Sequence, residues 1–420
     1  MQAMLPDSHS DAAVMTGQPP AAAPDMSPDP LIAALQERVL DAARRGARLR
    51  IRGGGSKDFY GEPLSGDLLD VSSLAGVISY EPSELVVTVR AGTRLAELEA
   101  LLVTQGQCLP FEPPHFGPAA TVGGMVASGL SGPARASSGA LRDYILGVKL
   151  LNGRGEVLTF GGQVMKNVAG YDVSRLLAGS LGTLGVLLEV SLKVLPIAPA
   201  EATVMFAGVG QQQALDLLNR WGGQPLPLSA SCWVHDSTST PARDFLFVRL
   251  RGAAAAVQAA APRLMAEVKA EAQTAAGDAV LMDNGQAGAD WAACREQTLP
   301  FFSDPPAAPA SARGQALSLW RISVPQTAPA IDWPEAVGAP FIEWHGGLRW
   351  VWAPARAAAA LRAAAERVGG NVTLFRHPAR PLPAGFPVFT PLAPVLQRIQ
   401  QQLQQQFDPD GVFNTKRLSI

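Results

Sequence analysis

The stretch Arg52-Gly53-Gly54-Gly55-Ser56-Lys57 decides the fold, because it follows a short apolar segment, residues 47–51, that is predicted to form a strand. Three consecutive glycines permit positive φ and expose successive backbone N–H groups. Such a run forms a concave anion site, and Arg52 and Lys57 add positive charge beside it. The sequence therefore predicts a loop that holds a phosphate or pyrophosphate. A plain flexible turn is the alternative, because the stretch matches neither the G-x-x-x-x-G-K-[ST] nor the G-x-G-x-x-G pattern.

Further glycine-rich segments follow this loop in a fixed order. They are residues 118–129 (PAATVGGMVASG), residues 141–148 (LRDYILGV) with the turn at 152–155 (NGRG), residues 166–172 (KNVAGYD) and residues 179–186 (GSLGTLGV). In this order and spacing they resemble the FAD-binding domain of the vanillyl-alcohol oxidase / para-cresol methylhydroxylase (PCMH-type) family. Residues 166–186 resemble more specifically the FAD-binding subunits of glycolate oxidase (glycolate dehydrogenase), the E subunits of that complex. The resemblance is strong over residues 31–196, moderate over residues 407–414 (FDPDGVFN) and faint between them.

The resemblance implies a flavin lying between two α+β subdomains, and it implies a set of FAD contacts. The expected cofactor-binding residues are Arg52, Gly53, Gly54, Gly55, Ser56, Lys57, Thr121, Gly123, Gly124, Ser128, Gly129, Arg142, Asp143, Lys166, Gly182, Thr183, Gly185, Val186 and Asn414. Several of these have a simpler alternative. Residues 121–129 could be a helix start packed tightly on a sheet, and residues 179–185 a connection without a ligand. Arg142 and Asp143 could form a surface ion pair, and Lys166 could be solvated.

Composition describes an ordinary globular protein with room for two or three domains, since 47% of the 420 residues are hydrophobic and 17% are charged. The net charge of −2 argues against a nucleic-acid partner. Cys108, Cys232 and Cys294 are too far apart in sequence to indicate a disulfide framework, an iron–sulfur cluster or any other metal site. No secretory signal and no membrane-spanning run is present, so a cytoplasmic location is expected, with membrane association only through partners at the inner membrane.

The pattern of elements predicts an α+β fold with four regions. Residues 1–28 are expected to be a disordered arm. Residues 29–199 form the PCMH-type FAD-binding domain of two α+β subdomains. It begins with a helix from Asp29-Pro30 to Gly46 that places Leu31, Leu35, Val39 and Leu40 on one helical face. Strands at 68–71, 77–80 and 85–89, with a helix capped by Thr93, form a mixed sheet. A hairpin at 148–160 and a strand at 186–195 form a second sheet.

The remaining regions are a cap domain and a C-terminal return. Strands at 202–206, 245–250, 317–324 and 348–352 alternate with alanine-rich helices at 253–270 and 355–368, which predicts an antiparallel sheet covered by helices over residues 200–390. Residues 391–420 begin with an amphipathic helix up to Phe407, with an apolar face of Leu392, Val395, Leu396, Ile399 and Leu403. The turn after it is expected to bring Asn414 back to the FAD domain.

The sequence offers only weak catalytic candidates. The first glycine loop contains no histidine, so FAD is expected to be bound non-covalently. The His-x-Gly-Asp-Gly-Asn-x-His stretch of related lactate-type flavoenzymes is absent. In residues 343–350 (EWHGGLRW), His345 could accept a proton and Arg349 could clamp a carboxylate. A structural role is the alternative for both, and Arg376 and His377 have similarly weak claims.

Three functions remain open on the sequence. The first is the FAD-binding subunit of a heteromeric dehydrogenase that oxidises glycolate, a 2-hydroxy acid, to glyoxylate. The resemblance implies a second FAD-binding subunit and an iron–sulfur subunit as its partners. The second is a self-sufficient FAD-dependent alcohol or aldonolactone oxidase of the same fold. The third is a scaffold subunit without catalysis.

Overall fold

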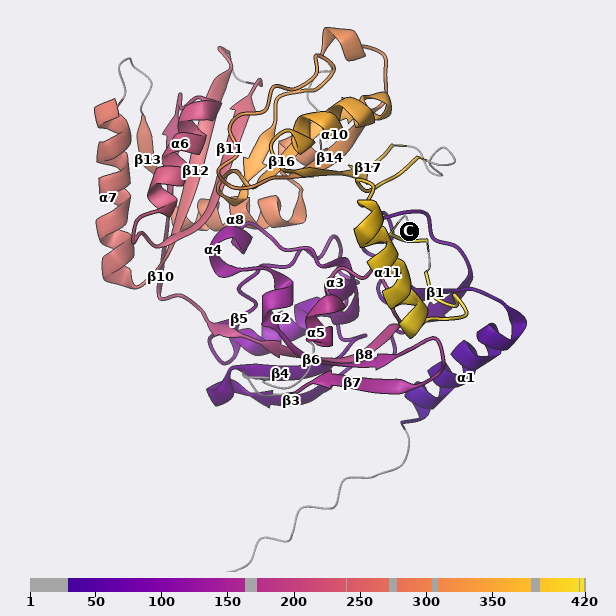
Figure 1. Ribbon diagram of the computed structural model, residues 1–420. Helices are drawn as coiled ribbons and strands as arrows, with labels where there is room; N and C mark the ends of the chain where they lie inside the picture. The colour runs from indigo at the N-terminus through magenta and orange to yellow at the C-terminus, as the bar shows by residue number, and fades with distance from the viewer. Residues whose placement is uncertain are drawn as a thin grey trace, which may run out of the picture.

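The computed structural model describes residues 29–162, 172–238, 240–271, 278–303, 309–378, 386–414 and 416–418. The predicted disordered arm and Lys166 lie outside these residues. The described chain forms two layered units, each built around one large β-sheet. The N-terminal half lies below and the unit with the larger sheet lies above in Figure 1.

The first helix, α1 (Pro30–Arg45), begins and ends where the sequence predicts. The Asp29 carboxylate accepts a hydrogen bond from Leu31 N, and Gly46 ends the helix with φ 63°. Leu35, Val39 and Ala42 are buried, whereas Leu31 and Leu40 are exposed, so the fold covers only part of the predicted apolar face. After α1, β1 (Leu49–Arg52) pairs in parallel with β2 (Asp67–Asp70) and leads into the glycine loop.

The five-stranded sheet has the order β3-β4-β8-β6-β7, and each of its pairs is antiparallel. Its strands are β3 (Val77–Glu81), β4 (Val86–Arg90), β6 (Ile145–Leu151), β7 (Val157–Gly161) and β8 (Val186–Lys193). The prediction that β3 and β4 form a mixed sheet with β2 is therefore wrong. Because Val86–Arg90 pairs along its length with β8, these strands join the hairpin β6–β7 instead. The α+β class itself is confirmed.

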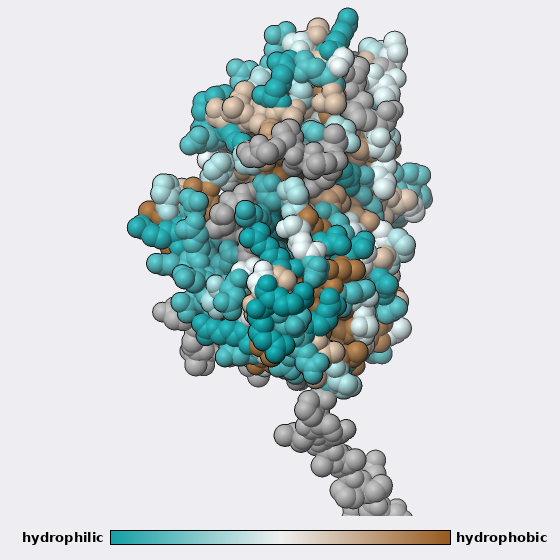
Figure 2. All heavy atoms as spheres, turned by 90° about the vertical axis from the view of Figure 1, so that its right-hand side faces the viewer, coloured by the Kyte–Doolittle hydropathy of each residue, from teal (hydrophilic) through white to brown (hydrophobic). Residues whose placement is uncertain are grey.

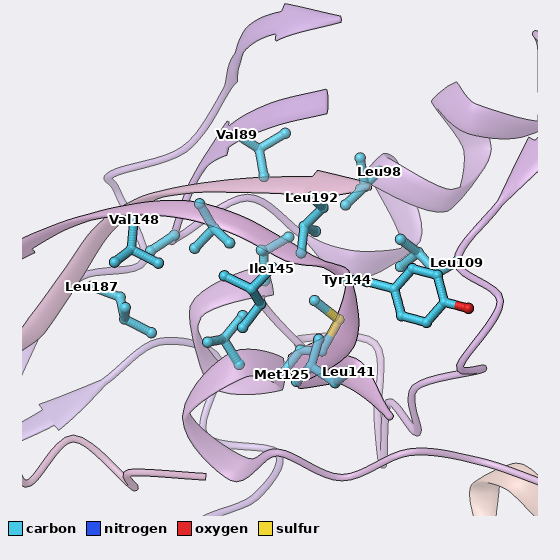
Figure 3. Packing of buried hydrophobic residues seen from close by; sticks show 14 of the residues in the cluster. Val89, Leu98, Leu109, Met125, Leu141, Tyr144, Ile145, Val148, Leu187 and Leu192 are labelled. Atoms are coloured by element: carbon cyan, nitrogen blue, oxygen red, sulfur yellow. The ribbon is translucent and has the colours of Figure 1, made fainter. Parts of the chain in front are cut away.

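Short helices cover one face of this sheet and close its core. They are α2 (Leu95–Val103), α3 (Val122–Ser128), α4 (Arg135–Ser138), the 3-10 turn η2 (Leu141–Tyr144) and α5 (Val173–Leu176). Figure 3 shows Met125 of α3 and Leu141 packed among the strand residues Ile145, Val148 and Leu192. Thr93 does not cap α2, as its hydroxyl donates to Gly76 O and accepts from Gly76 N. A short strand β5 (Gln107–Cys108) pairs with β9 (Leu195–Pro196) beside this core.

The second half of the chain builds an eight-stranded antiparallel sheet, the cap sheet, in the order β13-β10-β12-β11-β15-β16-β14-β17. Its strands are β10 (Ala200–Ala207), β11 (Leu228–Asp236), β12 (Arg243–Gly252), β13 (Ala279–Leu281), β14 (Leu317–Ser323), β15 (Phe341–Glu343), β16 (Leu348–Pro354) and β17 (Asn371–Arg376). The four strands predicted here are confirmed, and the sequence analysis missed β11, β13, β15 and β17.

The two faces of the cap sheet have different neighbours. One face packs against α6 (Gln211–Gly222), α7 (Ala254–Glu271) and α10 (Ala358–Glu366). The other face is covered by α8 (Asn284–Glu296) and α9 (Pro300–Ser303), and it also contacts the N-terminal half through Tyr60, Leu130 and Leu181. Two halves of the chain therefore meet at this second face.

The last helix, α11 (Pro394–Phe407), returns to the N-terminal half beside β1 in Figure 1. Only Leu403 and Phe407 pack against the core of the five-stranded sheet. Val395, Leu396 and Ile399 are 54–56% exposed, so the described chain leaves most of the predicted apolar face of this helix uncovered. This side of the molecule faces the viewer in Figure 2, where brown side chains interrupt a largely teal surface.

Candidate flavin and substrate site

The glycine loop opens onto a cavity of about 90 Å³, which we call the glycine cavity. Its walls come from three separate parts of the chain: the loop itself, one face of α3, and the C-terminal segment. The residues that line the cavity include residues 51–58, Thr121, Gly124, Ala127, Ser128, Leu181, Asn414 and Arg417. The structure thus brings together most of the residues that the sequence predicted for the first two FAD segments and for the C-terminal return.

Gly53 and Gly54 allow the loop to lie directly against the segment that precedes α3. A Cβ on Gly54 would lie 1.4 Å from Ala119 O, and one on Gly53 would lie 2.5 Å from Thr121 Oγ1. Gly55 has φ 73°, a left-handed conformation that favours glycine. The loop therefore needs glycine for its own packing, besides any ligand that it holds.

α3 turns different glycines toward the cavity and toward the sheet. Thr121 caps this helix by accepting a hydrogen bond from Gly124 N at 3.2 Å. An added Cβ on Gly124 would meet only Thr121 Oγ1, at 3.3 Å, whereas one on Gly123 would lie 2.9 Å from Ala91 Cβ. Gly124 and Ser128 line the cavity. Gly123 packs on the sheet, and Gly129 ends α3 with φ 64°. Close packing at Gly123 and the left-handed backbone conformation at Gly129 therefore explain why these two positions are glycine, without any contact to a ligand.

Two cations beside the loop have different surroundings. The Lys57 ammonium is largely desolvated and donates to His115 O at 3.1 Å, and burial lowers the pKa of Lys57 to about 8 despite the opposing effect of Glu296. A phosphate would restore the charge that burial disfavours. Arg52 is 43% exposed and lies 3.1 Å from Asp58 Oδ2, so it already has a partner at the rim.

The C-terminal segment closes the cavity from the opposite side. The Asp408 carboxylate accepts from Val412 N and Phe413 N, each at 2.8 Å, which turns the chain so that Phe413 forms a bridge beside Leu49. Asn414 Nδ2 then donates to Leu181 O, whereas its buried Oδ1 has no hydrogen-bond partner among the described residues. A buried acceptor without a partner in the wall of a cavity fits a ligand that donates to it.

Arg417 is a cavity residue that sequence reasoning missed. Its guanidinium donates to Asp58 O at 3.0 Å and to Glu62 O at 2.8 Å, and so it fixes the far end of the glycine loop. The only signal in the sequence was its position three residues after Asn414. A lone arginine in a short tail is not distinctive enough to predict this role.

The segment at 179–186 contributes its backbone more than its side chains. Gly182 has φ 74°, and an added Cβ would lie 3.0 Å from Asn414 Nδ2. The Thr183 hydroxyl donates to Ser180 O, Gly185 lies against Leu151 O, and Val186 is buried in the core between α1 and the sheet. These last three residues support the cavity wall rather than line it.

Arg142 and Asp143 do not line the glycine cavity. Their side chains are 71% and 48% exposed and lie 3.9 Å apart. The Asp143 carboxylate accepts from Ala140 N and so caps the turn η2. The surface-pair alternative describes their place in this structure, and Lys166 is outside the described residues.

His345 and Arg349 are both tied into the fold. His345 is buried between Ser231 of β11 and Ser137 of α4, with each ring nitrogen 2.9 Å from a serine Oγ, and burial lowers the pKa of His345 to about 4. Arg349 is fully buried and donates to the carbonyls of Ala328 and Pro329, and burial lowers its pKa to about 10. These contacts give the two side chains structural roles.

A second small cavity, of about 20 Å³, lies where the N-terminal half meets the cap sheet, and we call it the seam cavity. Phe116 and residues 130–133 line it from below. Arg321, Glu343 and Trp350 line it from the cap sheet. Sequence reasoning missed this site, because its polar groups lie on strands that are separated in sequence and only pair in the fold.

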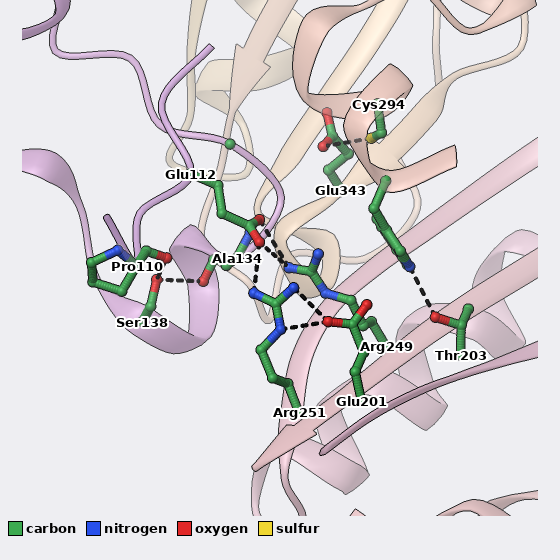
Figure 4. Close-up of polar contacts among 12 residues, drawn as sticks. Pro110, Glu112, Ala134, Ser138, Glu201, Thr203, Arg249, Arg251, Cys294 and Glu343 are labelled. Atoms are coloured by element: carbon green, nitrogen blue, oxygen red, sulfur yellow. Dashed lines mark hydrogen bonds and ion pairs between the residues drawn. The ribbon is translucent and has the colours of Figure 1, made fainter. Parts of the chain in front are cut away.

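A charged network holds the two halves together next to this cavity. The Glu112 carboxylate accepts from Arg249 at 2.8 Å and from Arg251 at 2.9 Å, and Arg251 also pairs with Glu201. Burial alone would raise the pKa of Glu112, but Arg249 and Arg251 hold it below its ordinary value. Figure 4 shows this network beside the Cys294–Glu343 contact. It fixes the relative position of the two halves, and hence the shape of the seam cavity.

Known proteins are similar to this chain in sequence or in fold. A family model described as the FAD binding domain matches residues 32–161. The chain is 43% identical over 385 residues to the glycolate oxidase subunit GlcE of Escherichia coli (strain K12), an alignment that covers 92% of this chain and 96% of that protein. It is 29% identical over 129 residues to the glycolate oxidase subunit GlcD of Bacillus subtilis (strain 168), which covers 31% of this chain and 27% of that protein.

One solved structure has the same architecture at low sequence identity. Alkyldihydroxyacetonephosphate synthase superposes with a TM-score of 0.62 at 14% identity, over 90% of this chain and 73% of that chain. This likeness concerns the fold alone. The near full-length identity above is the finding that relates the chain to a particular family.

Proposed function

The chain belongs to the family of the glycolate oxidase subunit GlcE, and on this premise we propose that it is the FAD-binding subunit of a heteromeric glycolate dehydrogenase that oxidises glycolate to glyoxylate. It is a flavoprotein with an FAD binding domain over residues 32–161. The observation that carries the proposal is the identity of 43% across 96% of that relative. The glycine cavity supports it with a site of suitable chemistry.

The described residues fit a phosphate-bearing cofactor. The bare backbone of the glycine loop, the desolvated Lys57 and the unpartnered Asn414 Oδ1 together provide donors, positive charge and one acceptor. When bound, FAD supplies the two-electron acceptor for oxidation of the alcohol. The protein contributes the cavity walls and the charge of Lys57 beside the phosphates.

Non-covalent attachment is part of the proposal. No histidine, cysteine or tyrosine is among the residues that line the glycine cavity in the described part of the chain. Each of these side chains is a nucleophile of the kind that a covalent bond to the cofactor would need.

The proposal also includes the partner subunits of this chain. We infer a second FAD-binding subunit and an iron–sulfur subunit, because electrons must leave this chain and its cysteines cannot hold a cluster: Cys232 and Cys294 are buried, and Cys108 is remote in sequence. No helix in the described part of the chain is long and apolar enough to cross a membrane. We infer a cytoplasmic protein that reaches the inner membrane only through its partners.

The test is turnover of glycolate with an electron-accepting dye, by the chain alone and by the chain co-purified with its partners. We expect rapid turnover only with the partners present. Equal turnover by the isolated chain would favour the self-sufficient oxidase. A complex that keeps full activity after this chain's FAD has been removed would favour the scaffold.

A further inference from the structure

Residues 112–116 (EPPHF), which we call the bridging segment, contact both the glycine loop and the cap sheet with its helices. Glu112 and Phe116, its first and last residues, have φ of 46° and 53°. This left-handed conformation is unfavourable for residues with a side chain, and it persists only where neighbouring groups hold it. Pro113 and Pro114 restrict the backbone between them. The shape of the bridging segment therefore depends on the contacts at its two ends.

Both ends of the bridging segment are held by residues from the second half of the chain. Glu112 accepts from the two arginines of β12 described above. At the other end, the Glu296 carboxylate, on the last residue of α8, accepts from Phe116 N at 2.8 Å and from His115 N at 3.1 Å. Two successive backbone N–H groups that converge on one anion form a nest, and such charge-assisted hydrogen bonds are stronger than neutral ones. Glu296 therefore fixes the peptide group between His115 and Phe116.

The fold sets the position of the Glu296 carboxylate independently of the bridging segment. α8 is fastened to the cap sheet, since Trp291 Nε1 donates to a threonine hydroxyl of β10 at 3.0 Å and Cys294 Sγ donates to Glu343 of β15 at 3.2 Å. Arg295 Nε donates to Glu296 Oε1 at 2.9 Å. The carboxylate thus belongs to the cap sheet and its helices, and it binds the N-terminal half through the two N–H groups.

The same peptide group holds Lys57 in the wall of the glycine cavity. Lys57 Nζ donates to His115 O at 3.1 Å and lies 5.6 Å from the centre of the Phe116 ring. The N–H and C=O of a trans peptide group point in opposite directions, so Glu296 binds one side of this group and Lys57 the other. Hydrogen bonds in such a chain polarise one another. Burial lowers the pKa of Lys57, and the negative charge of Glu296 opposes this change. Glu296 therefore both places the ammonium and favours its charged form.

We propose that Glu296 is a positioning residue for the cofactor: through the peptide group between His115 and Phe116 it places Lys57 against the phosphates of FAD, although it does not itself line the glycine cavity. Cofactor binding and the contact between the two halves are then coupled. Such coupling is reciprocal, so bound FAD tightens the hold of Glu296 on the bridging segment by the factor by which that hold tightens FAD. This inference rests on the FAD binding of the proposed function and does not depend on glycolate as the substrate.

The first experiment measures the dissociation constant of FAD for the full-length apoprotein by flavin fluorescence. Lys57→Met should weaken FAD binding about 10-fold or more, because a charge-assisted hydrogen bond is lost. Glu296→Ala should weaken it about 3- to 10-fold in the chain with Lys57, but less than about 2-fold in the Lys57→Met chain, where there is no ammonium to place. Glu296→Gln should have an intermediate effect, because its amide oxygen still accepts from Phe116 N.

The direction of the Glu296→Ala effect separates positioning from direct charge repulsion. Removal of a negative charge close to bound phosphates would by itself strengthen FAD binding, whereas loss of positioning weakens it. Glu267→Ala is the matched control, because the side chain of Glu267 on α7 is 24% exposed against 22% for Glu296 and pairs with Arg220 of α6 instead of the bridging segment. This control should change the dissociation constant of FAD by less than about 2-fold.

The second experiment measures hydrogen exchange in the bridging segment by mass spectrometry. Residues 113–116 contain only two backbone amides, those of His115 and Phe116, because proline has none. Both amides donate to Glu296 rather than into the glycine cavity. Saturating FAD should nevertheless slow their exchange about 3- to 10-fold in the wild type, by the reciprocity of the coupling. In Lys57→Met and Glu296→Ala, FAD should leave their exchange unchanged within about 2-fold, because the coupling is lost.

Each outcome decides the inference separately from the proposed function. Wild-type affinity for FAD in Glu296→Ala, an equal loss of affinity with and without Lys57, or exchange that FAD does not change would each overturn it, with the FAD site left standing. A wild-type chain that binds no FAD would overturn both the inference and the cofactor assignment. Failure to oxidise glycolate would refute the proposed substrate alone, since neither experiment measures turnover. The melting temperature of each apoprotein shows that it is folded, and if Glu296→Ala does not fold, Glu296→Gln provides the same comparison.

Discussion

Gly124 and Gly54 form neighbouring walls of the glycine cavity, but a side chain added at the two positions meets different surroundings. At Gly124 the new Cβ would contact only Thr121 Oγ1, and the rest of the side chain would enter the cavity. At Gly54 it would collide with Ala119 O. The sequence alone assigned one role, contact with the cofactor, to both glycines, because it could not show which surface each one faces.

Gly124→Val should therefore lose FAD while the apoprotein stays folded. Gly54→Ala should lower the stability of the apoprotein as well, by about 1–3 kcal/mol, as is typical of overpacking. FAD content by absorbance and thermal melting of both apoproteins measure the two effects. The account of the loop is wrong if the Gly54→Ala apoprotein has the same melting temperature as the wild-type apoprotein.

His345 makes the fold sensitive to acid. Burial lowers its pKa to about 4, so between pH 6.5 and 4 the unfolded chain binds a proton that the native state does not. The free energy of unfolding should thus fall as the pH drops through this window and should be unaffected above it. His345→Gln should flatten that dependence and cost about 1–3 kcal/mol at pH 7.5, because Ser137 and Ser231 lose their partner. Urea unfolding at pH 7.5, 6.0 and 5.0 checks this, and parallel curves for both proteins would refute it.

At the scale of the element, α11 is amphipathic but only its last turn is anchored. The ring of Phe407 lies 6.0 Å from that of Phe160, whereas Ile399 is 55% exposed. Sequence periodicity identified the apolar face correctly, but it does not reveal whether the fold covers that face. The packing angle of the helix decides this, and it depends on the Asp408 turn that ties the chain to β1.

Phe407→Ala should accordingly destabilise the protein by about 1–3 kcal/mol through lost burial. Ile399→Gln should change the free energy of unfolding by less than about 0.5 kcal/mol, as for other exposed positions. Chemical denaturation of the isolated chain measures both. A large loss for Ile399→Gln would show that this face is covered in the chain itself.

The elements predicted correctly share one property, a regular repeat of apolar residues that ends at recognisable capping or turn residues. α1 has Asp29 and Gly46 at its ends, and the hairpin β6–β7 has Asn152, whose Oδ1 accepts from Arg154 N and Glu156 N. β15 has only three residues, and α8 contains two glycines, so neither gives a distinct pattern. The pairing of β4 with β8, and the meeting of Arg321 with Glu343, are long-range events. Local sequence carries little information about either.

At the scale of the whole molecule, Glu112 joins the two halves of the chain. Its carboxylate neutralises Arg249, which is 2% exposed, and Arg251. Removal of one partner leaves a buried charge uncompensated, which is strongly destabilising. The network therefore contributes to the geometry of the seam as well as to stability.

Glu112→Ala should lower the free energy of unfolding by about 3–5 kcal/mol. Arg44→Ala removes half of an exposed pair, 3.7 Å from Asp41, and should cost less than about 0.5 kcal/mol. Denaturant unfolding of the two variants provides the comparison. Equal losses would mean that the buried network adds nothing to the fold.

The state of the flavin in the purified full-length chain tests the central claim most directly. We predict a yellow protein whose FAD passes entirely into the supernatant when the polypeptide is precipitated with acid, with about one FAD per chain, as expected for a single site held by non-covalent contacts alone. A colourless chain that cannot be reconstituted with FAD would contradict the assignment as an FAD-binding subunit. Flavin fluorescence that stays on the denatured polypeptide would contradict non-covalent binding in the glycine cavity.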